Sequence, residues 1–220
     1  MGIVLSRDCL TLRLVFSREG CVKPEHFEVL IVGAGLSGIG AACHLQKKCP
    51  RRDFAILEAR DCIGGTWDLF RYPGVRSDSD MFTLGYSFRP WTETKSIVGG
   101  ASILRYIRET AREHGIDRKI RFKHRVTRAS WCSEEGRWIV QAERGVSGEP
   151  SNLTCNFLIM CSGYYSYAEG YTPNFVGVGR FKGRIVQPQN WTRNASFDFP
   201  RPGNKDQCPN CFSTICLISS

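Results

Sequence analysis

The sequence lacks any apolar run that could cross a bilayer. The longest runs among its 220 residues, such as 157–161 and 29–32, are only as long as a buried strand. It also lacks a recognition motif for DNA or RNA. The net charge is +9, but Lys and Arg are spread along the whole chain. We therefore expect this charge to keep the surface hydrated and to attract small phosphate-bearing molecules, with no nucleic-acid partner and no identifiable protein partner.

Histidine is scarce, and the sequence shows no Ser/His/Asp set for nucleophilic catalysis. The four histidines lie in ordinary helix, strand or loop contexts, and we expect none of them to be catalytic. They are His26, His44, His114 and His124.

Cysteine is abundant, yet nothing in its pattern predicts a disulfide framework or a metal site. The count of eleven is odd and we see no secretory signal, so we expect buried free thiols. Cys208 and Cys211 have the CxxC spacing of half a zinc site, but no second pair or nearby histidine completes it.

The order of apolar runs is typical of an α/β fold. We expect a strand from about Phe27 to Val32, a glycine turn, a helix to about Cys49 and a second strand over 54–57. Such a βαβ unit belongs to a parallel sheet. Residues 61–100 form a long loop region, and a helix is expected over 102–114. Strands over 120–126, 138–142 and 153–161 predict a small antiparallel meander inserted in the parallel domain.

Residues 33–38 read Gly-Ala-Gly-Leu-Ser-Gly, the GxGxxG pattern, between an expected strand and an expected helix. Gly33 permits the tight turn, Gly35 lets the backbone approach a pyrophosphate, and Gly38 lets helix and strand pack closely. The N-terminus of the helix then presents N–H groups and a positive dipole to the phosphates. Pattern and context together predict a Rossmann-type dinucleotide-binding unit.

Glu58 ends the second expected strand, 20 residues after Gly38. A carboxylate at this place accepts hydrogen bonds from the adenosine ribose and repels a 2′-phosphate. The site therefore suits FAD or NAD rather than NADP.

The segment GGTWDLFRYPGVRSDSD follows at 64–80, and TLGYSFRPW at 83–91. With the glycine turn, these segments resemble the class B flavin monooxygenases of the Baeyer–Villiger type, over about 27–191. The resemblance implies a Rossmann-like FAD-binding domain, with FAD and NADPH as cofactors. In that family NADPH reduces FAD, and oxygen then forms a peroxyflavin that oxygenates a ketone, sulfide or amine.

The resemblance also implies roles for single residues. Ser37 would contact the FAD pyrophosphate, and Glu58 the adenosine ribose. Val126 would meet the adenine through its backbone, although an ordinary core valine is nearly as good an interpretation. The flavin side would be lined by Thr66, Trp67, Asp68 and Leu69. Arg76, Ser77 and Asp78 would lie where flavin and nicotinamide meet, with Asp78 and Arg76 as the catalytic candidates.

The sequence departs from the family near its end. The fingerprint FxGxxxHxxxWP appears as Phe181, Gly183 and Trp191, but Gln187 holds the histidine position and Thr192 the proline position. Glutamine cannot carry a proton at neutral pH, which predicts impaired turnover. The family's second GxGxxG unit, for NADPH, does not follow before Ser220. We therefore expect a truncated product.

The expected organisation has four parts: a poorly ordered extension over 1–24, an FAD-binding domain over 25–180, a linker over 181–191 and a disordered tail over 192–220. The main hypothesis is the FAD-binding portion of an NADPH-dependent flavin monooxygenase. A non-catalytic FAD-binding fragment or decoy and an NAD-dependent oxidoreductase are the alternatives. A cytoplasmic location is expected, with mitochondrion and membrane surface left open by the N-terminal residues.

Overall fold

The computed structural model describes residues 4–6, 24–182, 184–191 and 216–218. They form two compact units, each described by itself below. The first comprises 1–65 and 105–164, and the second comprises 66–104 and 165–220. No helix within the described ranges is long and apolar enough to cross a membrane.

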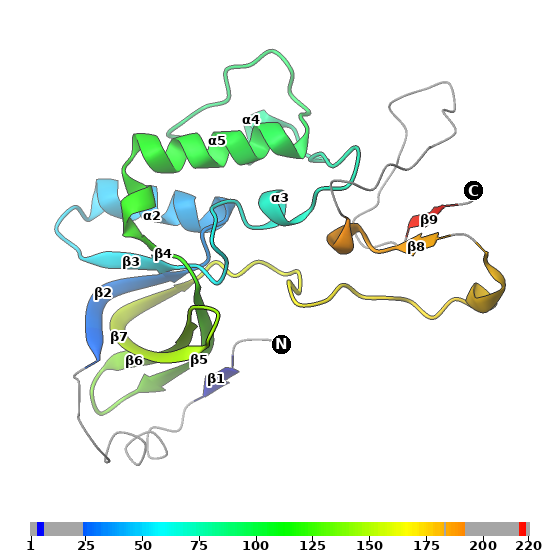
Figure 1. The fold of residues 1–220 in the computed structure, drawn as a ribbon. Helices are drawn as coiled ribbons and strands as arrows, with labels where there is room; N and C mark the ends of the chain where they lie inside the picture. The colour runs from blue at the N-terminus through cyan, green and yellow to red at the C-terminus, as the bar shows by residue number, and fades with distance from the viewer. Residues whose placement is uncertain (1–3, 7–23, 183, 192–215, 219–220) are drawn as a thin grey trace. The chain divides into compact units, whose positions relative to one another are not determined.

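A seven-stranded mixed sheet forms the first unit, in the order β1-β5-β6-β7-β2-β3-β4 (Figure 1). The strands are β1 (Val4–Ser6), β2 (Glu25–Val32), β3 (Phe54–Leu57), β4 (Ile120–Arg121), β5 (His124–Cys132), β6 (Arg137–Arg144) and β7 (Glu149–Met160). β2 pairs in parallel with both β3 and β7, whereas β5, β6 and β7 pair antiparallel. The predicted α/β fold, a Rossmann-like parallel sheet with an antiparallel meander, is confirmed.

The central strands explain why this sheet forms. β3 is buried at all four positions, and Leu30, Ile31 and Ile56 have no exposed surface. A parallel strand covered on both faces needs such an uninterrupted apolar run. Helix α2 (Leu36–Lys48) packs on β2 through small residues, among them Gly38 and Ala42, which are buried. β2 and β3 therefore lie in the core of the unit, and the glycine turn begins directly after β2.

One expected strand, over 120–126, is in fact two. β4 ends at Arg121 and pairs in parallel with β3, and β5 begins the meander at His124. Between them the chain turns at Lys123, whose φ of 56° is left-handed. The alternation of Ile120, Phe122 and Val126 continues through this turn, so the pattern alone conceals the break.

The last strand of the meander is longer than expected and is shared by both parts of the sheet. Its first half, from Glu149 to Cys155, pairs antiparallel with β6, and its second half, to Met160, pairs in parallel with β2. Leu153, Thr154 and Cys155 pair on both sides. The meander and the parallel strands therefore form one continuous sheet.

Helix α5 (Gly100–Glu113) has the predicted apolar stripe, and Ile103, Ile107 and Ala111 are fully buried. Gly115 follows it with a left-handed φ of 66° and begins the 3-10 helix η1 (Ile116–Lys119). The amide of Gln46, in α2, donates to the carbonyl oxygen of His114 at 3.0 Å, which ties the two helical segments together.

The second unit contains α3 (Thr66–Leu69) and α4 (Met81–Leu84), two short helices within the predicted loop region. Its small core includes Met81, Trp91 and Val98. The 3-10 helices η2 (Val178–Arg180) and η3 (Pro188–Asn190) follow, and β8 (Arg184–Val186) pairs antiparallel with β9 (Cys216–Ile218).

The predicted domain boundaries stay predictions. Within the expected N-terminal extension, residues 4–6 form β1, which pairs in parallel with β5. Within the expected tail, 216–218 form β9. The CxxC pair, Cys208 and Cys211, lies outside the described residues.

Candidate dinucleotide-binding site

The glycine turn (Gly33–Gly38) connects β2 to α2 at the carboxyl end of β2 (Figure 1). Gly33 has a φ of 104°, and a Cβ there would lie 2.4 Å from the carbonyl oxygen of Cys161. A Cβ at Gly38 would lie 1.9 Å from the carbonyl oxygen of Gly33. Both positions therefore require glycine for the fold itself.

Gly35 differs from these two glycines, because the space that a Cβ would occupy there is open. A Cβ there would meet no atom nearer than the Cα of Gly65, at 3.7 Å, and its φ of −82° suits any residue. Gly35 is the N-cap of α2 and has no side chain to cap the helix. The first turn of α2 thus presents its backbone N–H groups and the positive end of its dipole, beside the exposed Ser37. This arrangement suits a phosphate.

Glu58 follows β3 and is buried except for 5% of its surface. Its Oε2 accepts a hydrogen bond from the backbone N–H of Ala34 at 2.7 Å, and its Oε1 accepts one from that of Arg60 at 2.9 Å. The carboxylate therefore fixes the glycine turn to the end of β3. Each oxygen has a second lone pair, so two acceptor positions remain for a ligand.

The double-glycine loop (Ile63–Gly65) lies against the glycine turn. The N–H of Gly64 donates to the carbonyl oxygen of Ala34 at 3.1 Å. Gly64 has a φ of 138° and Gly65 one of 55°, and both are buried. The first unit thus brings together Gly33, Gly35, Ser37, Gly38 and Glu58, and the loop lies beside them.

Val126 also belongs to the first unit, close to this end of the sheet. The N–H of His124 donates to the carbonyl oxygen of Glu58 at 2.9 Å, which places the start of β5 next to the carboxylate residue. The side chain of Val126 is buried in the core with Leu57 and Ala142. The register of β5 on β6 shifts between Val126 and Arg128. A core position for the side chain is compatible with a backbone contact to adenine, which stays a prediction.

The remaining predicted residues lie in the second unit. Asp68, in α3, is buried, and both of its carboxylate oxygens lie 3.2 Å from Nη2 of Arg71. Nε of Arg71 also donates to the carbonyl oxygen of Asp68 at 2.9 Å. Asp68 therefore stabilises the start of this unit. Thr66, Trp67 and Leu69 are half-buried.

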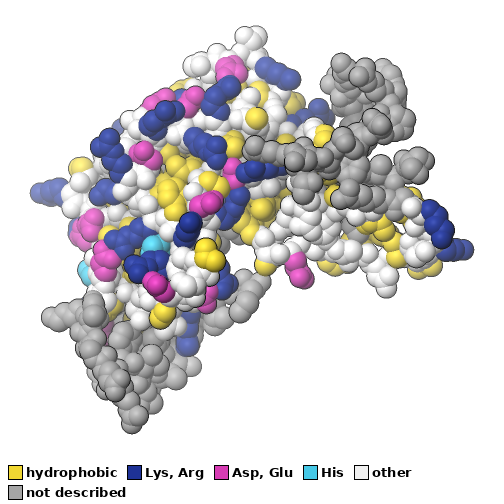
Figure 2. All heavy atoms as spheres, in the orientation of Figure 1, with side chains coloured by type: hydrophobic (Ala, Val, Ile, Leu, Met, Phe, Trp, Pro, Cys, Tyr) yellow, Lys and Arg dark blue, Asp and Glu magenta, His cyan; other side chains and the backbone are white. Residues whose placement is uncertain are grey.

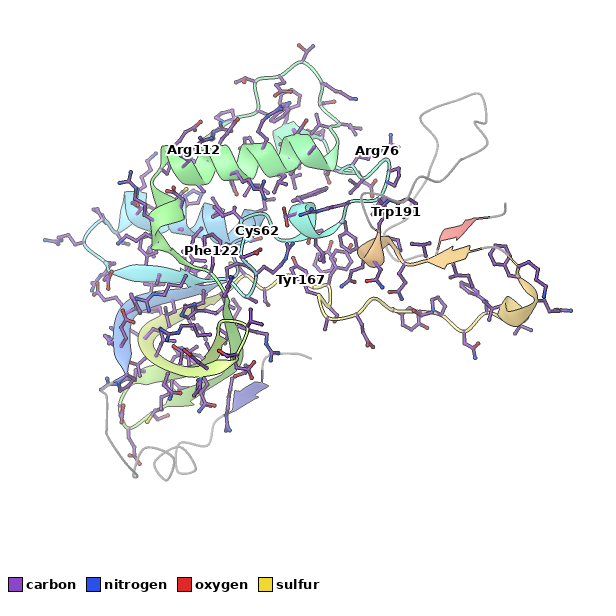
Figure 3. All side chains as sticks on the ribbon, in the orientation of Figure 1. Cys62, Arg76, Arg112, Phe122, Tyr167 and Trp191 are labelled. Carbon is purple, nitrogen blue, oxygen red and sulfur yellow. The ribbon has the colours of Figure 1, made fainter. Side chains whose placement is uncertain are left out.

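Arg76, Ser77 and Asp78 follow in the loop before α4. Figure 3 labels Arg76. Ser77 is buried, its N–H donates to the carbonyl oxygen of Val98 at 3.3 Å, and its Oγ accepts from the N–H of Ser79 at 3.1 Å. Arg76 and Asp78 are exposed. Ser77 fixes the loop, and its two neighbours present their charges to the solvent.

The neighbouring acid, Asp80, has a structural role. Its carboxylate accepts hydrogen bonds from the N–H and the hydroxyl of Thr83, both at 3.0 Å, and so caps α4. These hydrogen bonds lower the pKa of Asp80 below its ordinary value. No role was predicted for Asp80 from the sequence, since the capping contact is seen only in the structure.

Gln187 occupies the fingerprint's histidine position. Its Nε2 donates to the carbonyl oxygen of Gly170 at 3.0 Å and to the hydroxyl of Thr172. Gln189 likewise donates to the carbonyl oxygen of Ser166 at 3.0 Å. The two glutamines hold the segment 166–172, which is a structural role without proton transfer.

Charge on the surface is mixed in sign. On the face shown in Figure 2, Lys and Arg side chains are interspersed with Asp and Glu. Several are paired, for example Arg144 with Glu149 at 2.8 Å. This distribution differs from the basic stripe of a nucleic-acid interface, and the expected absence of such a partner stays a prediction.

Sequence reasoning missed two residues that contact the double-glycine loop. Nη1 of Arg60 donates to the carbonyl oxygen of Gly65, and Nε of Arg108, in α5, donates to that of Ile63, both at 3.3 Å. The contact of Arg108 joins distant parts of the sequence, so no local motif reveals it. Arg60 lies just after Glu58, but an arginine there has many ordinary uses.

Comparison with known proteins supports the same type of site. Residues 31–94 match a family model described as an NAD(P)-binding Rossmann-like domain. The chain is 55% identical over 174 residues to the FAD-containing monooxygenase EthA of Mycobacterium tuberculosis. The aligned region covers 79% of this chain and 35% of that protein. The chain is 45% identical over 173 residues to the probable FAD-binding monooxygenase AlmA of Acinetobacter baylyi, where the aligned region covers 79% and 34%.

Solved structures show the same relationship. A steroid monooxygenase bound to NADP superposes with a TM-score of 0.62 at 32% identity, covering 76% of this chain and 32% of that one. The OTEMO complex with FAD and NADP gives 0.62 at 27% identity, covering 77% and 31%. The predicted resemblance to flavin-dependent monooxygenases is confirmed, and the chain spans about a third of the length of the curated relatives it matches.

Proposed function

We propose that this chain, a homologue of FAD-containing monooxygenases as its sequence predicted, is the FAD-binding portion of an NADPH-dependent flavin monooxygenase. The observation that carries the proposal is the geometry around Gly35. The fold needs glycine at positions 33 and 38, whereas the space beside Gly35 is open to a ligand. A glycine that the fold does not need is explained by close approach of a diphosphate.

The residues present fit FAD at its adenosine diphosphate half. The N–H groups at the start of α2 and the hydroxyl of Ser37 would bind the diphosphate. The two remaining acceptor positions on the carboxylate of Glu58 would bind the ribose hydroxyls. The same carboxylate would repel a 2′-phosphate, which favours FAD over NADP at this site. The backbone of Val126 would contact the adenine.

We further propose that residues of the second unit act on the flavin half, as the family resemblance implies. Thr66, Trp67, Asp68 and Leu69 would line the flavin. Arg76 and Asp78 would set the charge near its reacting ring, and both are exposed and therefore accessible to a ligand. Ser77, by contrast, is buried and would keep these two residues in place through its hydrogen bonds.

When bound, FAD supplies the oxidation–reduction chemistry with NADPH and oxygen, and the protein supplies binding and orientation. A small ketone, sulfide or amine is the proposed substrate class of the whole enzyme. Among the residues described, the glycine turn and Glu58 would hold the cofactor, and the exposed guanidinium of Arg76 would attract an anionic group such as a nicotinamide-dinucleotide phosphate.

A non-catalytic FAD-binding role is the second candidate, and Gln187 favours it. Its amide donates hydrogen bonds to Gly170 and Thr172, and an amide does not act as an acid or a base at neutral pH. An NAD-dependent oxidoreductase is the third candidate, since Glu58 accepts any adenosine ribose.

Purification of the 220-residue chain with added FAD tests the three candidates together. The proposal predicts a yellow protein with flavin absorbance, and FAD-binding heat in calorimetry. NADPH consumption with an oxygenated product would exclude the non-catalytic role. A folded, colourless protein that binds NAD but ignores FAD would overturn the proposal in favour of the oxidoreductase.

A further inference from the structure

Hydrogen bonds hold the double-glycine loop on the glycine turn and fix its conformation. The backbone of the loop is joined to the turn by a hydrogen bond from the N–H of Gly64 to the carbonyl oxygen of Ala34 at 3.1 Å. The left-handed φ values of Gly64 and Gly65 leave this stretch easy to rearrange, because glycine also adopts many other conformations. Something further must restrict it for a ligand site to be preformed.

Two arginines from different elements supply that restriction. Arg60 precedes the loop, and its Nη1 reaches forward to the carbonyl oxygen of Gly65 at 3.3 Å. Arg108 belongs to α5, and its Nε reaches the carbonyl oxygen of Ile63 at 3.3 Å. The two contacts lie on either side of Gly64, so the loop is bound at both ends.

Arg60 is itself well positioned for this task. Its backbone N–H donates to Oε1 of Glu58 at 2.9 Å, and its carbonyl oxygen accepts from the N–H of Lys123 at 2.9 Å. The residue that holds the loop is thus fixed to the same carboxylate that fixes the glycine turn. Loop and turn share one hydrogen-bonded network through Glu58.

We propose that Arg60 and Arg108 are positioning residues that hold the double-glycine loop on the glycine turn, and so preorganise the site for the diphosphate of a dinucleotide. The proposal rests on the proposed function for its ligand. Its physical basis is that a loop ordered beforehand does not lose conformational entropy when the ligand binds. Both guanidinium groups also add positive charge to the loop that borders the start of α2.

Replacement by methionine tests the proposal, because it keeps the length of the side chain and removes donors and charge. In Arg60→Met and Arg108→Met, amide hydrogen exchange at Gly64 and Gly65 in the ligand-free chain should accelerate about tenfold, from the loss of one hydrogen bond to a charged donor. FAD affinity, measured by flavin fluorescence, should fall by a similar factor.

Arg112→Met is the matched control. Arg112 lies one turn beyond Arg108 on the same helix, is exposed and belongs to its last turn (Figure 3). The substitution Arg112→Met removes the same charge at a position that does not hold the loop, so amide exchange at Gly64 should not change. Exchange in β6 should stay constant in all variants, which shows that the sheet remains folded.

Two results would overturn the proposal: unchanged exchange at Gly64 in both loop variants, or equal loss of FAD affinity in Arg112→Met. Failure of the wild-type chain to bind FAD would instead refute the proposed function. The exchange measurement needs no cofactor, so it still decides whether the arginines hold the loop.

Discussion

The substitution Gly35→Ala should distinguish the contribution of this glycine to ligand binding from its contribution to stability. The new methyl group would meet no protein atom nearer than the Cα of Gly65, at 3.7 Å, which is ordinary van der Waals contact. The φ of −82° is favourable for alanine. Alanine is a poorer N-cap than glycine, but it also lowers the entropy of the unfolded chain, and the two effects together change stability by less than about 1 kcal/mol. The midpoint of thermal unfolding should therefore move by less than about 4 °C.

The effect of Gly35→Ala on FAD should be much larger. The methyl group would occupy space beside the start of α2, where the proposed diphosphate approaches. Each N–H to phosphate hydrogen bond is charge-assisted and contributes about 1.5–3 kcal/mol. Loss of two of them would weaken binding by about a hundredfold or more, at 1.4 kcal/mol per factor of ten.

The assay for this variant is flavin fluorescence titration together with thermal unfolding. Gly179→Ala is the control, because a Cβ there meets nothing within 4 Å and should alter neither quantity. Unchanged FAD affinity in a folded Gly35→Ala protein would refute the placement of the diphosphate. A collapse of stability without added ligand would refute the argument that this position is open.

Four other predictions follow from the contacts and the burial of individual residues. Gly38→Ala should destabilise the chain by about 2–4 kcal/mol in chemical unfolding, because its Cβ would lie 1.9 Å from a carbonyl oxygen. Glu58→Gln should weaken FAD binding about 10- to 100-fold in titration. The N–H of Ala34 or of Arg60 would then face the amide N–H₂ of glutamine, which cannot accept its hydrogen bond. Burial raises the pKa of Cys43 and of Cys155 to about 11, so alkylation at pH 8 followed by mass spectrometry should label the exposed Cys49 before these two thiols. The unfolded thiols ionise near pH 8.5, so the free energy of unfolding should fall as pH rises from about 9 to 11.

The βαβ unit was predictable from the sequence because its signals are local. β3 was predicted at its observed bounds, and the helix end at Cys49 within one residue, since apolar runs and the glycine turn mark these elements. The break at Lys123 was not predictable. It depends on β4 pairing beside β3 while β5 starts the meander, and both strands have the same alternation.

The candidate site likewise contains residues that the sequence predicts and contacts that only the structure reveals. Glu58 was predicted from its spacing to the glycine turn, and the structure shows its carboxylate holding that turn. The contacts of Arg108 with Ile63 and of Gln187 with Gly170 depend on tertiary structure and have no sequence pattern. Asp68 was predicted to line the flavin, and only the structure reveals its pairing with Arg71.

The double use of β7 has a consequence for the order of events during synthesis. The side chains of His26 and Thr154 are hydrogen-bonded although the two residues are 128 positions apart. The N–H of Cys161 donates to the carbonyl oxygen of Val32 at 2.8 Å. As the chain leaves the ribosome, the backbone groups on the β7 side of β2 therefore stay unpaired until β7 has been synthesised. Contacts of such sequence separation form slowly. The nascent glycine turn is thus without its final support until almost the whole meander has emerged, and in that interval the unpaired edge of β2 is open to pairing with other strands.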